Sequence, residues 1–288
     1  MGVLDGKVAL VTGASRGVGK GVALALGEAG AIVYVTGRSR QEGDAPLPGT
    51  IDKTVEEIAA RGGKAIAVPC DHRNDDEVES LIAAIVNDQG RIDILVNNVF
   101  AVPDDLIEAK PFWERPLSHW DDMIDLGLRA HYVAARAAAP HMVGAGQGLI
   151  VNISSPGARC YIHSAIYGIG KAGADKMAAD MAKELRDHGV AALSLWLGIV
   201  KTERTTMALE AAPEAYAPLM DGLESPEYPG RIIAALYENG QVMARSGQAW
   251  YTSELGAELK IEDVDGRIPA SYREMLGGPA APNPAMIS

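Results

Sequence analysis

The chain has little of several things that mark other classes of protein. Its 288 residues include only two cysteines, Cys70 and Cys160, which excludes a disulfide framework and provides no metal-ligand spacing. There are 26 Lys and Arg against 38 Asp and Glu, and the net charge of −12 argues against nucleic acid as a partner. No run approaches the ~20 apolar residues of a membrane span, and the N-terminus leads almost directly into a strand, without a signal peptide. We therefore expect a cytoplasmic protein with no metal site and no membrane partner.

Short apolar runs alternate along the chain with stretches of helical pattern. The runs are apolar nearly throughout, which indicates strands covered on both faces. The expected strands are Lys7–Val11, Ala31–Thr36, Lys64–Pro69, Ile92–Val96, Gly148–Ile153 and Ala191–Trp196, and the helices between them are Gly17–Ala29, Thr50–Arg61, Asp75–Gln89, Leu117–Val143 and Ala165–His188. A helix at Pro226–Asn239 and a strand at Gln248–Thr252 extend the pattern. This rhythm predicts an α/β fold with a doubly wound parallel sheet of Rossmann type, in a single domain over residues 1–276.

Glycines cluster between the first expected strand and the first helix, in the segment Thr12-Gly13-Ala14-Ser15-Arg16-Gly17-Val18-Gly19. A tight turn without side chains at this place lets a pyrophosphate approach the N-terminus of the helix. A plain turn with a helix cap is the alternative, but the flanking strand and helix favour a dinucleotide site. NAD-binding chains carry an acidic residue about 20 positions further on, whereas an arginine there accommodates a 2′-phosphate. Arg38 stands at the end of the second strand and Arg16 inside the glycine loop, so NADP(H) is favoured, with NAD(H) as the alternative.

Three stretches depart from the alternating pattern. Residues 40–49 separate a strand from its helix by more than the usual ~2–6 residues, which predicts an inserted surface loop near the adenosine end of the cofactor. Residues 203–224 are rich in Ala, Leu, Met and Pro and follow a strand end, so we expect a lid over an apolar substrate, with plain packing on the sheet as the alternative. Residues 277–288 contain three prolines, which predicts an extended or mobile tail.

A phenol and an amine stand four residues apart at the start of a helix, in Tyr167 and Lys171. Residues at this spacing share one face of a helix. A free tyrosine has a pKa near ~10, and we expect the nearby ammonium to lower it toward neutral pH. The hydroxyls of Ser154 and Ser155 end the preceding strand, where one of them can hold a substrate carbonyl.

With these residues in view, the sequence over roughly residues 5–255 resembles the classical short-chain dehydrogenase/reductase family. The glycine loop, Asn97-Asn98 after the fourth strand, the serine pair, Tyr167 and Lys171 follow the family order. The resemblance implies that Tyr167 is the acid/base, that Lys171 binds the ribose and lowers the pKa of the tyrosine, and that a serine polarises the carbonyl.

Two serines fit the family position. Counting 13 residues back from Tyr167 points to Ser154, whereas aligning the strand end points to Ser155. We favour Ser155, because the strand end determines which face a side chain points to. The resemblance also implies that Asp71 contacts adenine, Asn98 supports the cofactor and Thr202 touches the nicotinamide amide or the phosphate. The expected cofactor-binding set is Gly13, Ser15, Arg16, Gly17, Val18, Gly19, Arg38, Asp71, His72, Asn98, Tyr167, Lys171, Val200 and Thr202.

Several further segments resemble the member-1 branch of the family, among them residues 120–122, 127–132, 146–150, 154–157 and 263–267. Vertebrate members of that branch reduce steroid and xenobiotic carbonyls with NADPH. The chain departs from the family pattern at three places: Asn97-Asn98-Val99-Phe100 stands for Asn-Asn-Ala-Gly, Leu197-Gly198 for Pro-Gly, and Gly127 for a helix asparagine that serves a proton relay. A glycine can keep the helix kink on which such a relay depends, and we expect an irregular helix at Gly127.

These observations predict an NADP(H)-dependent oxidoreductase that interconverts a carbonyl and a secondary alcohol on a small apolar substrate. The alternatives are a nucleotide-binding sensor or scaffold without turnover, which Gly127 favours, and lyase or epimerase chemistry on the same fold. By family resemblance, the long helices 117–143 and 165–188 predict a homodimer or homotetramer.

Overall fold

The computed structural model describes residues 2–211, 213–283 and 285. Seven parallel strands form one sheet in the order β3-β2-β1-β4-β5-β6-β7. Their bounds are β1 Val8–Val11, β2 Ile32–Gly37, β3 Lys64–Pro69, β4 Ile94–Asn97, β5 Gly148–Ser154, β6 Val190–Trp196 and β7 Ala249–Tyr251. The order reverses between β1 and β4, which places a ligand crevice at the carboxyl ends of these two strands. The predicted α/β fold with a doubly wound parallel sheet is confirmed.

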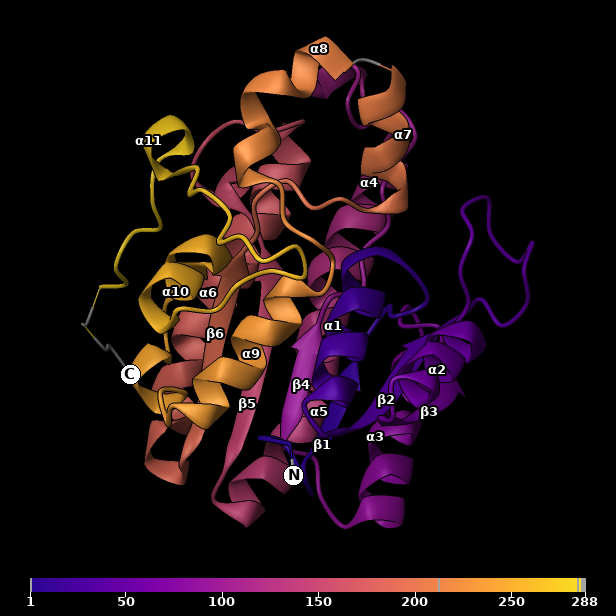
Figure 1. Cartoon of the computed structure of the whole chain (residues 1–288), viewed down its shortest axis with the longest axis vertical. Coiled ribbons are helices and arrows are strands. Elements are labelled where there is room, and N and C mark those ends of the chain that lie inside the picture. The colour runs from indigo at the N-terminus through magenta and orange to yellow at the C-terminus, as the bar shows by residue number, and fades with distance from the viewer. Residues whose placement is uncertain (1, 212, 284, 286–288) are drawn as a thin grey trace.

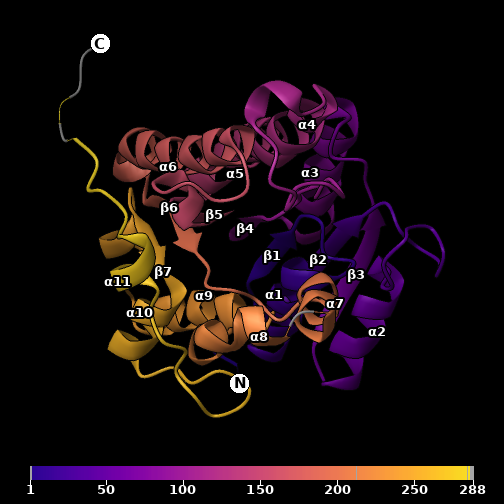
Figure 2. The same cartoon turned by 90° about the horizontal axis from the view of Figure 1, so that it is seen from above.

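Helices cover both faces of the sheet (Figures 1 and 2). The helices are α1 Gly17–Glu28, α2 Ile51–Ala60, α3 Asp75–Gln89, α4 Ser118–Trp120, α5 Ala130–Ala145, α6 Ala165–Leu185, α7 Glu203–Ala211, α8 Pro213–Tyr216, α9 Tyr228–Glu238, α10 Thr252–Leu259 and α11 Arg273–Leu276. Short 3-10 turns occur at Phe112–Glu114, Pro156–Ala158, Arg186–His188, Ala217–Gly222 and Met243–Arg245.

Each strand sends alternate residues into two separate cores. In β1, Ala9 and Val11 pack with α1, α2 and α9, whereas Val8 and Leu10 pack with α3, α5 and α6. All four side chains are at most 2% exposed. This double burial is the reason the strands are apolar nearly throughout.

The expected single helix Leu117–Val143 is wrong in one respect. Its first part is α4, its last part is α5, and the residues between them, Asp121–Arg129, form a π-helix that contains Gly127. A π-helix is rare and is often found at functional sites. The irregular helix expected at Gly127 is therefore present, as a widened turn.

Of the three stretches expected to depart from the pattern, the segment 203–224 is mostly helical, and the described residues of the other two carry neither helix nor strand. No helix or strand is assigned between Gly37 and Ile51. In the segment 203–224, of which residue 212 lies outside the described residues, α7 and α8 lie over the carboxyl ends of the strands (Figure 1). Residues 277–283 and 285 have neither helix nor strand, and the other positions of the expected tail, 284 and 286–288, lie outside the described part of the chain.

Candidate active site

A cleft of about 850 Å³ opens at the carboxyl ends of the strands, around the point where the strand order reverses. Ligand pockets commonly have volumes of ~300–1,000 Å³. Every residue that we expected to bind the cofactor lines this cleft, together with both candidate serines: Gly13, Ser15, Arg16, Gly17, Val18, Gly19, Arg38, Asp71, His72, Asn98, Val200, Thr202, Tyr167, Lys171, Ser154 and Ser155. Segments as distant in sequence as the first and sixth strands thus contribute to one site.

The glycine loop leads from β1 to the N-terminus of α1. Gly17 has φ +55°, a left-handed conformation that favours glycine. Asn98, just after β4, donates from its amide nitrogen to the carbonyls of Thr12 (2.9 Å) and Gly13 (3.0 Å). Asn98 therefore holds the shape of the glycine loop.

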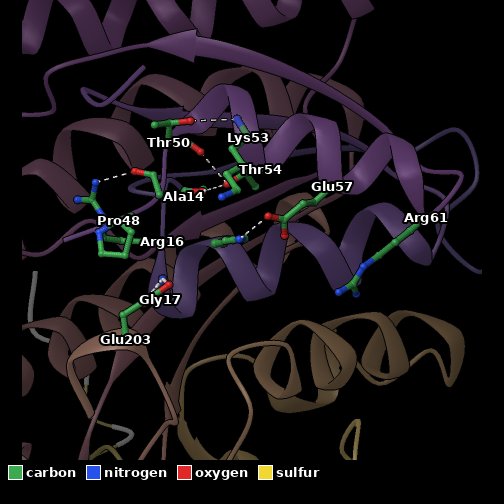
Figure 3. A network of polar contacts seen from close by, with 12 residues as sticks. Ala14, Arg16, Gly17, Pro48, Thr50, Lys53, Thr54, Glu57, Arg61 and Glu203 are labelled. Atoms are coloured by element: carbon green, nitrogen blue, oxygen red, sulfur yellow. Dashed lines mark hydrogen bonds and ion pairs between the residues drawn. The ribbon is translucent and has the colours of Figure 1, made fainter. Parts of the chain in front are cut away.

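A carboxylate lies at the N-terminus of α1. The backbone N–H of Gly17 donates to Glu203 Oε2 at 3.1 Å and to Oε1 at 3.4 Å, so the first residue of α7 contacts the first residue of α1 (Figure 3). Free N–H groups and the helix dipole attract an anion at such a position. The sequence places a pyrophosphate at this helix N-terminus, and the structure places a carboxylate there. The position therefore suits a negatively charged group such as a phosphate. Sequence reasoning missed Glu203, because no local pattern predicts a contact across 186 positions.

Two arginines meet at one end of the cleft. Arg16 donates to the carbonyls of Pro48 (3.0 Å) and Gly49 (2.7 Å), so it anchors the end of the 40–49 loop (Figure 3). Arg38 is exposed and its Nη1 lies 3.8 Å from Asp71 Oδ2. Burial lowers the pKa of Arg16, and the positive charge of Arg38 adds to this lowering, as expected of two cations that share one region.

His72 lies below this end of the cleft. Its Nε2 is 2.9 Å from Thr36 Oγ1, and burial lowers its pKa to about 4. His72 is therefore neutral at physiological pH. A neutral, hydrogen-bonded imidazole adds no charge to the phosphate region.

The two catalytic candidates of α6 lie at the cleft floor with Ser155. Ser164 caps α6 by accepting from the backbone N–H of Tyr167. The hydroxyls of Ser155 and Tyr167 are 2.9 Å apart. Lys171 Nζ donates to the carbonyl of Ile153 at 3.2 Å.

Ser154 lies on the other side of its strand. Its hydroxyl donates to the backbone carbonyl of Lys171 at 3.3 Å, and the residue is 2% exposed. Of the two serines, Ser155 is therefore the one that contacts the tyrosine hydroxyl. Ser155 is also the serine that alignment of the strand end favours.

Burial governs the proton affinities of the pair. It raises the pKa of Tyr167, against the opposing effect of the Ser155 hydrogen bond. It lowers the pKa of Lys171 to about 8, against the charge of Asp175. The expected lowering of the tyrosine pKa by Lys171 is therefore wrong for this structure. The phenol is held protonated, as a proton donor must be.

Apolar side chains form the wall beside these polar groups. Phe100, Val102 and Leu197 line the cleft, and Phe100 contacts the Tyr167 ring edge-on with 6.1 Å between ring centroids. Above them, α7 contributes Arg204, whose Nη1 lies 3.7 Å from Asp104 Oδ1 on the opposite rim. In the sequence alone, Phe100 stands out only as a departure from the family pattern.

The described residues contain neither a metal site nor a membrane-spanning helix. Within residues 2–211, 213–283 and 285, no group of His, Cys, Asp and Glu has the geometry of a metal site. No helix in the described part of the chain combines the length and hydropathy needed to cross a bilayer.

Comparison with known proteins places this site in a family. The model of the short chain dehydrogenase family matches residues 7–212. The chain is 41% identical over 279 residues to "Dehydrogenase/reductase SDR family member 1" of Homo sapiens and of Mus musculus, with 93% of this chain and 87% of each relative covered. It is 37% identical over 206 residues to a 3-oxoacyl-[acyl-carrier-protein] reductase of Synechocystis, covering 71% of this chain and 78% of that one.

A solved structure agrees with these relatives. A metagenomic short-chain oxidoreductase in complex with NADP aligns with a TM-score of 0.67 and 28% identity, covering 86% of this chain and 97% of the other. Members of the family are NAD(P)-dependent oxidoreductases. The chain belongs to the short-chain dehydrogenase/reductase family.

Proposed function

We propose that this protein is an NADP(H)-dependent oxidoreductase that interconverts a carbonyl and a secondary alcohol on a small apolar substrate. The observation that carries the proposal is the 2.9 Å contact between the Ser155 and Tyr167 hydroxyls, beside Lys171 in the cleft that the glycine loop borders. Two hydroxyls that meet at one point can both hydrogen-bond the same substrate oxygen. A nucleotide-binding sensor or scaffold would not require such a pair of hydroxyls.

The residues divide the work of the reaction between them. A bound nicotinamide supplies the hydride. Ser155 donates a hydrogen bond that orients the carbonyl oxygen, and Tyr167 gives its proton to that oxygen during reduction. Burial raises the pKa of Tyr167 and so keeps the phenol protonated, which favours the reductive direction. Lys171, fixed by the Ile153 carbonyl, presents a cation to the ribose and to the phenolate that remains.

Arg38 and Arg16 support the choice of NADP(H) over NAD(H). Both line the cleft at the end of β2, where a 2′-phosphate is bound in NADP-dependent relatives of this fold. Arg38 is 65% exposed in its side chain and so is accessible to a ligand. The neighbouring Asp71 carboxylate would bind adenine by hydrogen bonding.

The substrate lies between the apolar wall and the lid. Phe100, Val102 and Leu197 provide apolar surface next to the hydroxyl pair, which favours an apolar carbonyl compound. We propose residues 203–224 as the lid, because Glu203 and Arg204 of α7 bridge the cleft from Gly17 to Asp104.

The helix pair α5 and α6 supports assembly with a second copy. Tyr132 and Ile169 are 53% and 51% exposed on these helices. We propose a homodimer or homotetramer, to be measured by light scattering of the purified protein.

Oxidation of NADPH by a panel of aldehydes and ketones tests the proposed function. We expect turnover on apolar members of the panel and faster turnover with NADPH than with NADH. Tyr167→Phe is the inactive control and Tyr161→Phe, at a 78% exposed tyrosine, is the matched active control. Lack of turnover on every carbonyl and alcohol, with nucleotide binding intact, would favour the sensor or scaffold alternative.

A further inference from the structure

The Phe100 ring packs against the backbone of Gly127, in the space that a side chain at position 127 would fill. A Cβ atom on Gly127 would lie 2.6 Å from Cδ2 and 3.0 Å from Cε2 of the Phe100 ring. Real Cβ atoms essentially never approach another heavy atom within 3.0 Å. The phenyl ring is therefore seated on the bare backbone of Gly127, and any larger residue at 127 would displace it.

This seat lies in the widened part of the helix. Gly127 belongs to the π-helix Asp121–Arg129 and is buried. Glycine in a helix interior costs about 1 kcal/mol relative to alanine. The ring contact supplies a reason for glycine here.

The Phe100 ring also lies under the catalytic lysine. Lys171 Nζ is 4.8 Å from the centroid of this ring, within the ~6 Å range of a cation–π contact. Its other contacts are the hydrogen bond to the Ile153 carbonyl at 3.2 Å and the Tyr167 ring, whose centroid is 5.7 Å away. The amine thus lies between a backbone oxygen and two aromatic rings, of which Phe100 is the nearer.

No charged side chain among the described residues forms a close ion pair with Lys171, so the ring contact can contribute to the stability of its ammonium. Asp175, one turn further along α6, acts on the lysine by its charge, but no ion pair within 4.0 Å joins Lys171 to another of the described residues. His131 of α5 is neutral, because burial lowers its pKa to about 3. Tyr167 is neutral too, because burial raises its pKa. The negative face of the Phe100 ring therefore adds to the charge of Asp175 in stabilising the ammonium, and its centroid is nearer to the amine than that of the Tyr167 ring.

We propose that Phe100, seated on Gly127, is a positioning residue that holds the Lys171 ammonium at the catalytic cleft through a cation–π contact. The proposal deepens the proposed function and rests on it for the role of the lysine. The two departures from the family sequence, at 100 and at 127, are then one structural unit, since the glycine makes room for the ring.

The contact has a measurable consequence for the charge of the lysine. Burial sets the pKa of Lys171 to about 8, and the ring favours the charged form. Removing the ring face removes part of the stabilisation of the ammonium. The pKa of Lys171 should then fall by about one unit, and a larger fraction of the enzyme should lose its ammonium at neutral pH.

Four variants test the proposal. Phe100→Leu removes the aromatic face but keeps an apolar side chain, Phe100→Tyr keeps the face, and Gly127→Ala displaces the ring. Phe112→Leu is the matched control, because Phe112 is the only other phenylalanine of the sequence and is 69% exposed. The primary measurement is the pKa of Lys171 in the full-length protein, from NMR of 13C-labelled lysine, with the resonance assigned by its loss in Lys171→Met. It requires neither cofactor nor substrate.

We expect the Lys171 pKa to fall by about one unit in Phe100→Leu and Gly127→Ala, and to stay near about 8 in Phe100→Tyr and Phe112→Leu. The double variant Phe100→Leu with Gly127→Ala should match the single variants, because both remove the same contact. In turnover, kcat should fall about tenfold in Phe100→Leu, with recovery in Phe100→Tyr.

An unchanged Lys171 pKa in Phe100→Leu would overturn the proposal, even if turnover fell. A lowered pKa in Phe100→Leu without turnover on any carbonyl in the wild type would support the positioning role and contradict the proposed reaction instead. Should Gly127→Ala fail to fold, the comparison of the Lys171 pKa in Phe100→Leu and Phe100→Tyr still tests the proposal.

Discussion

The carboxylate of Glu203 lies 3.1 Å from the backbone nitrogen of Gly17, at the N-terminus of α1. A nucleotide pyrophosphate would compete with this carboxylate for the same N–H group. Since Glu203 is also the first residue of α7, nucleotide binding and the position of the proposed lid are coupled through one side chain.

We expect Glu203→Gln to bind NADPH about two- to fivefold more tightly than the wild type, because the variant lacks the competing negative charge. The dissociation constant is measured by fluorescence titration. Glu210→Gln is the matched control, since it makes the same change at an exposed position of the same helix. Weaker NADPH binding in Glu203→Gln would show that the carboxylate supports the bound state.

Tyr167→Phe should lower kcat by ~10²–10⁴ and leave the NADPH dissociation constant within about twofold. The lost hydroxyl gives a proton to the substrate, whereas the ring and its contact with Phe100 remain. Steady-state kinetics and a separate binding titration check the two parts. Near wild-type turnover in this variant would remove Tyr167 from its assigned role.

The two serines should differ in their effect on catalysis. Ser155→Ala removes the hydroxyl that contacts Tyr167 and should lower kcat on the order of 10². Ser154→Ala removes a hydrogen bond to the Lys171 backbone and should cost about 1 kcal/mol of stability with little change in kcat. Each variant is the control of the other, in kinetics and in thermal unfolding. The reverse order of effects would make Ser154 the catalytic serine.

Arg38→Asp should raise the NADPH dissociation constant about ten- to hundredfold more than that of NADH, because the 2′-phosphate loses a cation and meets a carboxylate. Arg40→Asp is the matched control: Arg40 pairs with Asp52 much as Arg38 pairs with Asp71, but it does not belong to the cleft lining. Tighter binding of NADH than of NADPH by the wild type would contradict the arginine argument.

Stability should depend on pH through a buried acid, Glu224. It is 1% exposed and accepts a hydrogen bond from the backbone N–H of Gly198 at 3.0 Å, and burial raises its pKa from the ordinary 4.5 to about 8. Between these two pH values the folded chain binds more protons than the unfolded chain, so stability falls as the pH rises. His72 titrates with the opposite sign between about 4 and 6.5, which leaves pH 6.5–8 as the clearest window.

Glu224→Gln should therefore lose this decline, which amounts to roughly 1 kcal/mol per pH unit. Urea unfolding at pH 6.5, 7 and 8 measures it. Glu262→Gln, the same change at an exposed position, should keep the wild-type slope. Parallel slopes in Glu224→Gln and the wild type would mean that Glu224 is charged in the folded protein.

Local patterns were enough to predict the framework of the molecule. Runs such as Val8–Val11 are apolar because both faces of the strand are buried, and the glycine loop and the Tyr167–Lys171 spacing are features of short segments. The π-helix at Gly127 is harder to predict from the sequence, because α- and π-helices place apolar residues in similar patterns. The glycine within it makes room for the Phe100 ring, which is 27 positions away in sequence.

Contacts between distant segments account for the remaining differences. The Glu203–Gly17 bond joins segments 186 positions apart, and no pattern around either residue indicates it. The raised pKa of Tyr167 follows from its enclosure in the folded chain, whereas spacing in the sequence shows only that Lys171 is near. Charge and spacing can be read from a sequence, but desolvation requires the packed structure.

The bonds from Arg16 to Pro48 and Gly49 divide the inserted loop into two parts that differ in their tolerance to changes of length. Its base is tied to the residue that precedes α1, so a deletion at Pro48 would pull on the phosphate site. Its tip is open: Gly43 has no atom within 4 Å of where a Cβ would lie. Lengthening a flexible loop is inexpensive, about 0.6 kcal/mol for each doubling. Residues 44–47, between the tip and the base, line the nucleotide cleft, so a reporter peptide or affinity tag has to be inserted before residue 44 to leave that lining unbroken.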